Sequence, residues 1–443
     1  MRLATHTLGC KLNFAETSHL QKQFEGIGFN IVDYHQKADI YIINTCTVTS
    51  VAEKKCRTAI RQAISQNPDA IIAVIGCFAQ VNAAQIEKIP GVDIVLGNDR
   101  KHLLLDILIE HGLLPTPSSP QTPKPTSTGH PVCVNTDEPH SFQLSWSGDD
   151  RTRTFFKIQD GCDYFCSYCA IPFARGRSRS ATIDQTVAAA RVIAQSGTKE
   201  VVLTGVNTGT FGQQHGELFV DLLRQLDKIE SILRFRISSI EPNLITEEVI
   251  DFVAASRAFL PHFHIPLQAG SDKVLKMMHR RYDTHLFASR VEYIKKVMPH
   301  ACIAADVITG FNGEDEMTFQ QSKAFINSLP ISYLHVFPYS DRPNTAALRM
   351  DEKIPVEVRK ARSVELNNLS HIKRHQFIES QMGQTRSVLW EHTQHPADSG
   401  FDMQGWTDNY IRLHRPYDPA LSGSVTPYLI NNSTIVENFA CED

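Results

Sequence analysis

Strand-like and helix-like segments alternate along most of this chain, and this alternation limits the possible folds more than any other feature. In residues 1–110 the apolar segments "RLATHTLG", "ADIYIIN" and "AIIAVIG" are separated by stretches in which apolar residues recur with helical spacing. Strands connected through helices run parallel, and a parallel sheet is covered by helices on both faces. The sequence therefore predicts an α/β fold with a parallel N-terminal sheet.

The same alternation resumes in residues 151–375. Six further strands are predicted there, at "TFFKIQ", "EVVLT", "LRFRIS", "PHFHI", "CIAADVI" and "SYLHVF". The segments between them are long enough for crossover helices. This pattern predicts a partial (β/α)6 barrel, in which functional groups lie on loops at the carboxyl ends of the strands.

Two segments depart from the alternation. The segment "LLPTPSSPQTPKPTSTGHPV" is rich in proline, serine and threonine and cannot bury enough apolar area to fold alone, which predicts a linker. The C-terminal segment is rich in strand signals, which predicts a small β-barrel that binds oligonucleotides, or alternatively a structural β cap. The predicted domains are an N-terminal domain at 1–112, a linker at 113–147, a barrel at 148–375 and a β domain at 376–441.

The composition is that of an ordinary globular protein. Of the 443 residues, 42% are hydrophobic and 21% charged, and the net charge is -4, which argues against a protein that is basic all over but allows a local basic face. No apolar run approaches the roughly 18 residues that a membrane helix needs, and no signal peptide is recognisable. The expected location is the cytoplasm, where the ten cysteines are expected to be free, catalytic or metal-binding.

A compact cysteine motif follows the first predicted barrel strand. The segment "GCDYFCSYC" spaces Cys162, Cys166 and Cys169 as C-x3-C-x2-C. Zinc sites usually gather four ligands from separated pairs, and a 4Fe–4S cluster that only transfers electrons takes four cysteines. Three thiols leave one iron open for another ligand. The motif, with its aromatic Tyr168, resembles that of the radical S-adenosylmethionine (SAM) superfamily, which implies that the open iron binds SAM and that reduction yields a 5′-deoxyadenosyl radical.

Three other cysteines end strand-like segments of the N-terminal domain. Cys10, Cys46 and Cys77 are far apart in the sequence, but the carboxyl ends of parallel strands meet at one edge of a sheet. Any one of them alone would be interpreted as a buried core thiol. Three at equivalent positions, two of them preceded by Gly9 and Gly76, predict a second iron–sulfur cluster that also has an open iron.

The whole chain apart from the linker resembles the methylthiotransferase family. The similar blocks are "TLGCKLNFAETS", "INTCTVT", "VIGCFAQ", "GCDYFCSYCAIPFARGRSRS", "HIPLQAGSD" and "ITGFNGE", and the β tail resembles the RNA-binding TRAM module of that family. The resemblance implies addition of sulfur and a methyl group to an unactivated C–H bond. One SAM methylates a sulfur species on the auxiliary cluster, and a second SAM supplies the radical. The implied cofactors are two 4Fe–4S clusters and SAM.

The family has branches that differ in substrate. The segments "GCKLNFAETS", "IPFARGRSRS" and "LHVFPYSDRPNTAA" are most similar to the branch that acts on threonylcarbamoyladenosine beside the tRNA anticodon. The alternatives are isopentenyladenosine in tRNA and an aspartate of a ribosomal protein. A threonylcarbamoyl group carries a carboxylate, which favours an arginine partner. Arg175, Arg177 and Arg179 are the candidates, although contact with phosphate or a solvated charged face would explain each of them equally well.

Further candidates are expected near SAM. The resemblance to the radical SAM superfamily implies Tyr168 and, in "LTGVN", Gly205, although a plain strand-end turn also explains Gly205. The expected barrel geometry adds Ser239, Glu241 and Gln268 at strand ends, although each could instead cap a helix or brace the barrel. No side chain is proposed as a general acid or base, because an aromatic C–H has no acidic proton.

Two other classes of protein compete with this interpretation. A multi-cluster electron-transfer protein would be expected to show four cysteines for each cluster, and a zinc-dependent RNA-binding module would hold zinc in place of iron. The predicted partners are the anticodon stem-loop of tRNA, an external electron donor and a sulfur source. No membrane and no stable protein partner are predicted.

Overall fold

The computed structural model describes residues 1–114, 131–134, 140–148, 152–391 and 402–436. They form two compact units. The first comprises Met1–Gly148, Phe155–Arg179 and Ser340–Leu348, and the other described residues form the second. The segment with the compact cysteine motif therefore belongs to the same unit as the N-terminal sheet. Most of the predicted linker lies outside the described residues, and the four domain boundaries stay predictions.

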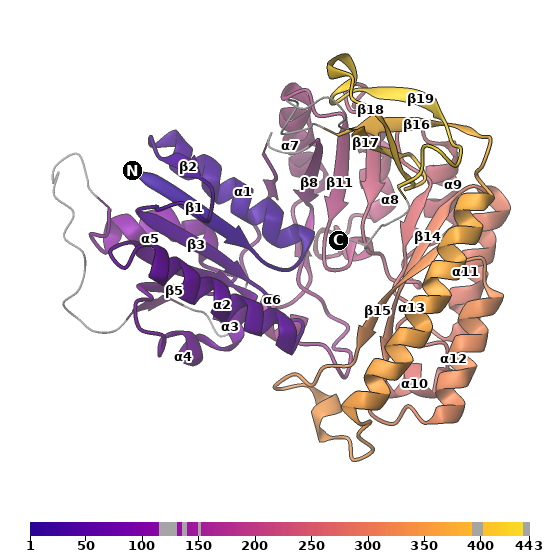
Figure 1. Cartoon of the computed structure of the whole chain (residues 1–443), viewed down its shortest axis with the longest axis horizontal. Helices are drawn as coiled ribbons and strands as arrows, with labels where there is room; N and C mark the ends of the chain where they lie inside the picture. The colour runs from indigo at the N-terminus through magenta and orange to yellow at the C-terminus, as the bar shows by residue number, and fades with distance from the viewer. Residues whose placement is uncertain (115–130, 135–139, 149–151, 392–401, 437–443) are drawn as a thin grey trace. The chain divides into compact units, whose positions relative to one another are not determined.

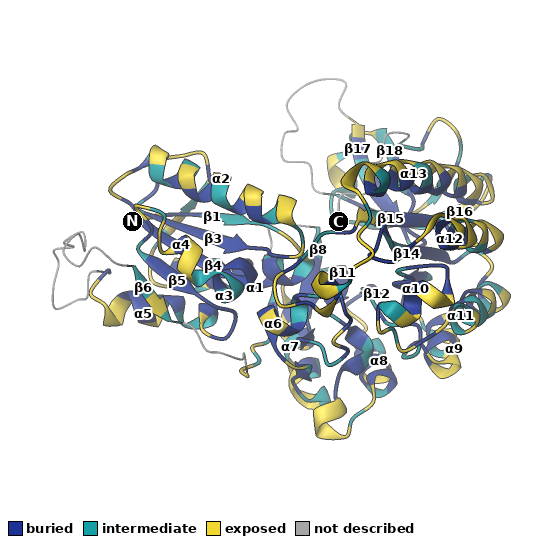
Figure 2. Cartoon of the chain, turned by 90° about the horizontal axis from the view of Figure 1, so that it is seen from below, coloured by how far each residue is buried: buried dark blue, intermediate teal, exposed yellow. Residues whose placement is uncertain are grey.

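The first unit is built on a six-stranded parallel sheet (Figure 1). The strands lie in the order β2 (Asn30–Val32), β1 (Arg2–Thr7), β3 (Ile40–Thr45), β4 (Ile71–Gly76), β5 (Ile94–Leu96) and β6 (Val132–Val134). Every residue of β3 and β4 is buried, as Figure 2 shows in dark blue. Strands that are buried on both faces have continuous apolar sequences, and "IYIINT" and "IIAVIG" show this pattern.

Helices cover both faces of this sheet. Along β3, Tyr41 and Ile43 pack in one core cluster with residues of α2 (Ser50–Gln66), whereas Ile40 and Ile42 pack in another with residues of α1 (Lys11–Gly26) and α5 (Leu104–Glu110). This alternation follows from the two-residue period of a strand. Two short helices, α3 (Cys77–Val81) and α4 (Ala83–Ile86), follow β4. The predicted α/β fold class is confirmed.

The second unit contains a further series of parallel strands. Its strands are β11 (Glu200–Thr204), β12 (Arg234–Ile237), β13 (His262–His264), β14 (Cys302–Thr309) and β15 (Tyr333–Pro338). The pairs β11–β12, β13–β14 and β14–β15 are parallel, and single bridges such as Ser239 to His264 connect the β12 segment to the β13 segment. Together with β8 (Arg153–Lys157), these strands coincide with the six that the sequence predicts.

Helices follow the strands of the second unit as the sequence predicts. They are α7 (Ile183–Gln195), α8 (Phe219–Asp227), α9 (Glu247–Ala255), α10 (Asp272–Met277), α11 (Thr284–Val297), α12 (Glu316–Ser328) and α13 (Val356–Glu379). Side-chain caps start four of them: Thr182, Thr246, Asp283 and Asp315 each accept a hydrogen bond from a backbone N–H of the first turn. Helix α13 packs along β14 and β15 (Figure 1).

A four-stranded antiparallel sheet ends the described chain. Its order is β18 (Arg412–Pro416), β17 (Asp402–Thr407), β16 (Thr385–Trp390) and β19 (Val425–Leu429). The sequence analysis missed β17, whose Gly405 resembles a turn residue. Trp390, Trp406 and Tyr410 are buried in a core cluster there, so their rings are core groups and not an exposed surface for bases. No helix among the described residues is long and apolar enough to span a membrane.

Candidate active site

The sheet of the first unit brings the three scattered cysteines to one edge. β1 and β4 flank β3, and in the pairing register Thr45, the last residue of β3, lies opposite Gly76, the last residue of β4. Cys46 and Cys77 come directly after these two residues, and Cys10 follows β1 and precedes the first residue of α1. Cys46 and Cys77 thus lie at strand ends as predicted, whereas Cys10 lies three residues beyond Thr7, the last residue of β1.

At this edge the chain before Cys10 packs against Cys46. A Cβ atom added to Gly9 would lie 2.8 Å from Cβ and 2.9 Å from Sγ of Cys46, so the chain before Cys10 contacts the Cys46 thiol. Burial, together with the negative charges of Cys77 and Cys10, raises the pKa of Cys46 to about 12. Cys46 and Cys77 are buried, whereas Cys10 is exposed.

A fourth thiol lies beside this set. Cys56, in α2, is buried, and its Sγ is 3.4 Å from the backbone nitrogen and 3.5 Å from the backbone oxygen of Cys46. Burial raises its pKa to about 11. The sequence analysis left Cys56 unassigned, because nothing in its helical context indicates that it contacts a residue ten positions earlier.

The compact cysteine motif forms a loop between β9 (Gln159–Asp160) and α6 (Ile171–Arg175). The N–H of Cys169 donates to the carbonyl of Cys166 and that of Cys162 to the carbonyl of Gly176, both at 3.0 Å. One hydrogen bond within the loop and one to Gly176, which follows α6, thus fix the backbone that carries the three thiols.

Glycines with positive φ directly precede two of the scattered cysteines and one cysteine of the compact motif. These glycines are Gly9, Gly76 and Gly161, with φ of 98°, 96° and 70°. A Cβ on Gly76 would lie 2.9 Å from the carbonyl oxygen of Thr45, and one on Gly161 would overlap the carbonyl of Arg177. Only glycine fits these positions without strain.

Two asparagines connect α6 to the scattered cysteines. Asn13 donates to the carbonyls of Leu8 and Thr45, at 2.7 and 3.1 Å, and accepts from Arg175 at 2.6 Å. Asn98 donates to the carbonyl of Ala174 at 2.7 Å, and its amide nitrogen is 3.4 Å from Sγ of Cys77. The helix that follows the compact motif is therefore fixed to the edge that carries the scattered thiols.

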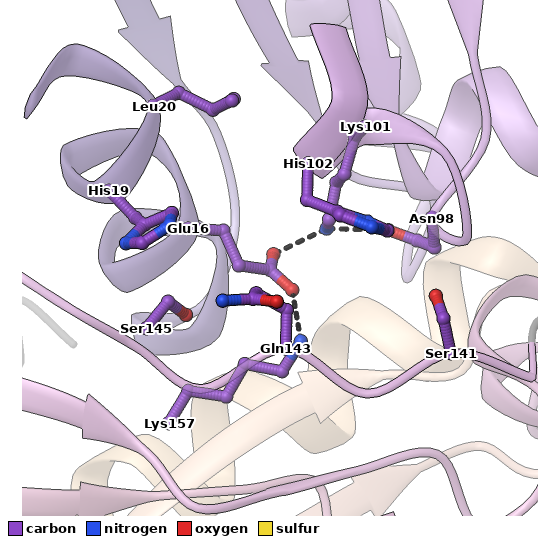
Figure 3. A pocket seen from close by; sticks show the side chains of 10 residues that line it. All are labelled: Glu16, His19, Leu20, Asn98, Lys101, His102, Ser141, Gln143, Ser145 and Lys157. Carbon is purple, nitrogen blue, oxygen red and sulfur yellow. Dashed lines mark hydrogen bonds and ion pairs between the residues drawn. The ribbon is translucent and has the colours of Figure 1, made fainter. Parts of the chain in front are cut away.

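A buried network of charged side chains lies beside these contacts. Glu16 pairs with Lys101, with Lys157 at 2.7 Å and with Arg175 at 3.3 Å, and Asp160 pairs with Lys157 at 2.8 Å and with Arg175 at 2.9 Å. Figure 3 shows Glu16 between the two lysines. Burial alone would raise the pKa of Glu16, but the three cations hold it below its ordinary value. The sequence analysis missed this network, whose members come from distant segments.

The three candidate arginines have different environments. Arg175 is 1% exposed and engaged with Glu16, Asp160 and Asn13, and Arg179 is buried and donates to the carbonyl of Ser141. Of the three, only Arg177 has an exposed side chain, at 65%, near Asp163 at 3.6 Å. Arg175 and Arg179 are thus engaged within the protein, and contact of any of the three with substrate stays a prediction.

The residues predicted to lie near SAM fall in both units. Tyr168 is half-buried in the cysteine loop of the first unit. In the second unit, Gly205 follows β11, Ser239 and Glu241 follow β12, and Gln268 follows β13. Their contacts with SAM stay predictions.

Three of these groups have defined partners in the second unit. The carbonyl of Ser239 accepts from Thr208 at 2.9 Å, and the buried carboxylate of Glu241 pairs with Arg280. Gln268 has a φ of 65°, and its N–H donates to the carbonyl of Asp306 at 2.8 Å. Burial raises the pKa of Glu241, although Arg280 opposes the shift.

A polar cluster that the sequence analysis did not assign lies next to these strand ends. His264, Asp306 and His335 come from β13, β14 and β15, and their ligand atoms lie within 4.8 Å of one another. His264 Nε2 and Asp306 Oδ1 are 2.7 Å apart. Two imidazoles and a carboxylate can hold a divalent ion, but the hydrogen bond between His264 and Asp306 and the packing of the His264 ring against His335, with centroids 5.1 Å apart, also account for the cluster.

Both cysteine sets suit iron–sulfur clusters. Thiolate sulfur is the protein ligand of such clusters, and each set offers three thiols from a fixed backbone. Cys56 lies against the backbone of Cys46, so it is a fourth thiol beside the three of the scattered set.

Comparisons with known proteins agree with this arrangement. Residues 2–97 match the model of the uncharacterized protein family UPF0004, and residues 156–326 match the radical SAM superfamily. Threonylcarbamoyladenosine tRNA methylthiotransferase MtaB of Bacillus subtilis (strain 168) is 38% identical over 93% of this chain and 89% of its own length. MtaB of Aquifex aeolicus (strain VF5) is 37% identical over 94% of this chain and 97% of its own length.

This chain belongs to the radical SAM tRNA methylthiotransferase family. It is therefore a transferase, and the cofactors of the family are SAM and 4Fe–4S clusters. A relative named tRNA-2-methylthio-N(6)-dimethylallyladenosine synthase, from Protochlamydia amoebophila (strain UWE25), is 30% identical over 87% of this chain and 84% of its own length.

A solved structure shares the fold. The radical SAM methyltransferase TsrM from Kitasatospora setae has a TM-score of 0.55 and 16% identity, covering 76% of this chain and 72% of its own. At this level of identity the likeness concerns the fold alone, and it confirms a radical SAM barrel fold.

Proposed function

We propose that this enzyme methylthiolates C2 of N6-threonylcarbamoyladenosine at position 37 of tRNA, giving 2-methylthio-N6-threonylcarbamoyladenosine, with two clusters. The observation that carries the proposal is that two sets of three cysteines lie in one compact unit and are connected through Asn13 and Asn98. The 38% identity to an MtaB relative over 93% of the chain supports the choice of substrate.

The cysteines would hold the two clusters, Cys162, Cys166 and Cys169 for the one that binds SAM and Cys10, Cys46 and Cys77 for the auxiliary one. When bound, SAM and its cluster supply a radical that can open an unactivated C–H bond, which acid–base groups cannot do. The protein contributes placement, because the hydrogen bonds of Asn13, Asn98 and Arg175 fix α6, which follows the compact motif, to the chain around the scattered cysteines.

Among the candidate arginines, Arg177 is the one suited to the carboxylate of the threonylcarbamoyl group. Its guanidinium is exposed, eight residues after Cys169 in the same unit, and a carboxylate accepts two parallel hydrogen bonds from such a group. An apolar isopentenyl group would make no use of this charge, and Arg177→Met should therefore weaken the reaction on the threonylcarbamoyl substrate.

Nucleoside mass spectrometry tests the reaction and the substrate together. Reconstituted enzyme, SAM, reductant and a sulfur source are incubated without oxygen with tRNA that carries threonylcarbamoyladenosine, and in parallel with isopentenyladenosine tRNA. We expect a methylthio mass gain on the first tRNA only. Iron and sulfide content are measured on the same samples, since loss of a cluster would also abolish activity.

Other outcomes would each exclude part of the proposal. A gain on the isopentenyl tRNA would keep the chemistry and overturn the substrate, and relatives at 30% identity are named for a dimethylallyladenosine product. If neither tRNA gains mass while 5′-deoxyadenosine forms, the substrate is not tRNA, and the aspartate of a ribosomal protein is tested next. Absence of 5′-deoxyadenosine from cluster-loaded enzyme would favour an electron-transfer protein.

A further inference from the structure

The first unit contains a small pocket, which Figure 3 shows from close by. Its buried wall includes Lys101, Lys157, Ser145 and Glu16. Exposed residues such as Gln143 also line it, so the pocket extends from buried charges to exposed side chains.

Cations outnumber anions among the charged groups that line this pocket. Both ammonium groups pair with Glu16, the one carboxylate among the residues that line the pocket. Lys101 also donates to Asn98 at 2.7 Å, and Lys157 also pairs with Asp160 at 2.8 Å. An ammonium group has three donors, so Lys101 keeps one N–H beyond these two contacts with described residues. The ammonium group of Lys157 also lies over the ring of Phe142, 5.4 Å from its centroid.

A buried hydroxyl in the wall points to a ligand independently of the charges. Ser145 is 2% exposed, and its Oγ has no hydrogen-bond partner among the described residues. A buried hydroxyl that makes no hydrogen bond is destabilising, and buried polar groups usually have a partner. An anion in the pocket would accept hydrogen bonds from Ser145 and Lys101, and the positive charge of Lys157 would attract it.

A single side chain connects this pocket to the scattered cysteines. Asn98 lines the pocket and accepts from Lys101 through its Oδ1, and its Nδ2 is 3.4 Å from Sγ of Cys77. An ion held by Lys101 would therefore be separated from the Cys77 thiol by one amide group.

We propose that this pocket binds a small monovalent anion and that, during the reaction, this anion is hydrosulfide, held beside Cys77 as the sulfur source. The second half of this inference rests on the proposed function, which consumes one sulfur atom for each product. Hydrosulfide has a full negative charge and the size of a halide ion, so it suits a small pocket with two ammonium groups and a hydroxyl donor. The ion binds unchanged, and no bond is made or broken in the pocket.

The binding half is tested with bromide on the full-length, cluster-loaded protein. Crystals soaked in sodium bromide should show an anomalous peak bounded by Lys101, Lys157 and Ser145. In Ser145→Ala the peak should weaken, and the melting temperature should not fall, because Oγ has no partner in the described protein to lose. Ser65→Ala, which removes an exposed hydroxyl on α2, is the control and should leave the peak unchanged. No peak in the unmodified protein overturns the inference.

The hydrosulfide half is tested by kinetics. Ser145→Ala should raise the KM for sulfide at least several-fold while the KM for SAM stays unchanged, and Ser65→Ala should change neither. A bromide peak combined with an unchanged KM for sulfide would overturn the role of hydrosulfide. If the unmodified enzyme does not methylthiolate any substrate, the proposed function fails, and the bromide experiment still decides whether the pocket binds anions.

Discussion

The two cysteine sets of the first unit are assembled in different ways. Eight residues of one loop contain all of Cys162, Cys166 and Cys169, so their proximity is a property of local sequence. Cys10, Cys46 and Cys77 span 68 positions and meet only because β1, β3 and β4 are neighbours in a parallel sheet. The difference teaches that a site can be specified by spacing or by strand order, and that the second kind depends on correct folding of the whole sheet.

The largest expected effect separates the proposed roles of the two sets. In Cys166→Ala, formation of both 5′-deoxyadenosine and methylthiolated nucleoside should fall below detection, because the SAM-binding cluster is lost. In Cys46→Ala only the methylthiolated nucleoside should be lost, because the radical source remains. Both products are measured from one reaction by mass spectrometry. Loss of 5′-deoxyadenosine in both variants would contradict separate roles.

The difference between the sets also explains what could be predicted from the sequence. The long strands β1, β3 and β4, the barrel strands and the α/β class follow from local periodicity, and the position of the three cysteines at one edge follows from the rule that parallel strands share an edge. The short strands β2, β5 and β6, and β17, were not predicted. The network of Glu16, Lys101 and Lys157 could not be predicted, because its members lie up to 141 residues apart and meet through tertiary packing. The buried partners of Arg175 could not be predicted either, because a sequence pattern does not show whether a charged side chain faces solvent or a buried partner.

A slightly smaller effect, on the free energy of unfolding, is expected for Arg175, which helps to connect the two cysteine sets. Arg175→Met leaves Glu16 and Asp160 with fewer cations in a buried site, which should destabilise the first unit by about 3–5 kcal/mol. The exposed Arg177→Met should cost at most about 1 kcal/mol. Denaturant unfolding of the apo proteins measures both values. Equal costs would contradict the assignment of Arg175 as the connecting residue.

The stability that the Glu16 carboxylate gives to the first unit should also depend on pH. Because the pKa of Glu16 in the folded protein lies below its ordinary value, its stabilisation is present above the unfolded pKa of about 4.3 and is lost as the pH falls through the folded value. Glu16→Gln should therefore be clearly less stable than the unmodified protein at pH 7, and the gap should narrow below about pH 4. Urea unfolding at several pH values measures this gap, and a gap that is independent of pH would show that the charge of Glu16 is unimportant.

Glycine substitutions compare the two loops directly. In Gly161→Ala the new methyl group overlaps a carbonyl and φ is positive, so the loss should exceed about 2 kcal/mol. Gly197→Ala has a φ of 82° but nothing within 4 Å of its Cβ, so it should cost only about 1 kcal/mol. Gly76→Ala should cost about as much stability as Gly161→Ala, and it should lower iron binding by the scattered set alone. Calorimetry and iron analysis distinguish these outcomes.

The smallest effect concerns the fourth thiol beside the scattered set. Cys56 contacts the backbone of Cys46 through its sulfur, so it belongs to the packing behind the set, whereas a cluster ligand would direct that sulfur toward iron. Cys56→Ala should lower stability by at most about 2 kcal/mol and leave the iron content and the yield of methylthiolated nucleoside unchanged. Mössbauer spectra of the variant and the unmodified protein measure the clusters. Loss of half the iron would mean that the scattered set has four ligands, which would remove the open iron and favour a cluster that only transfers electrons.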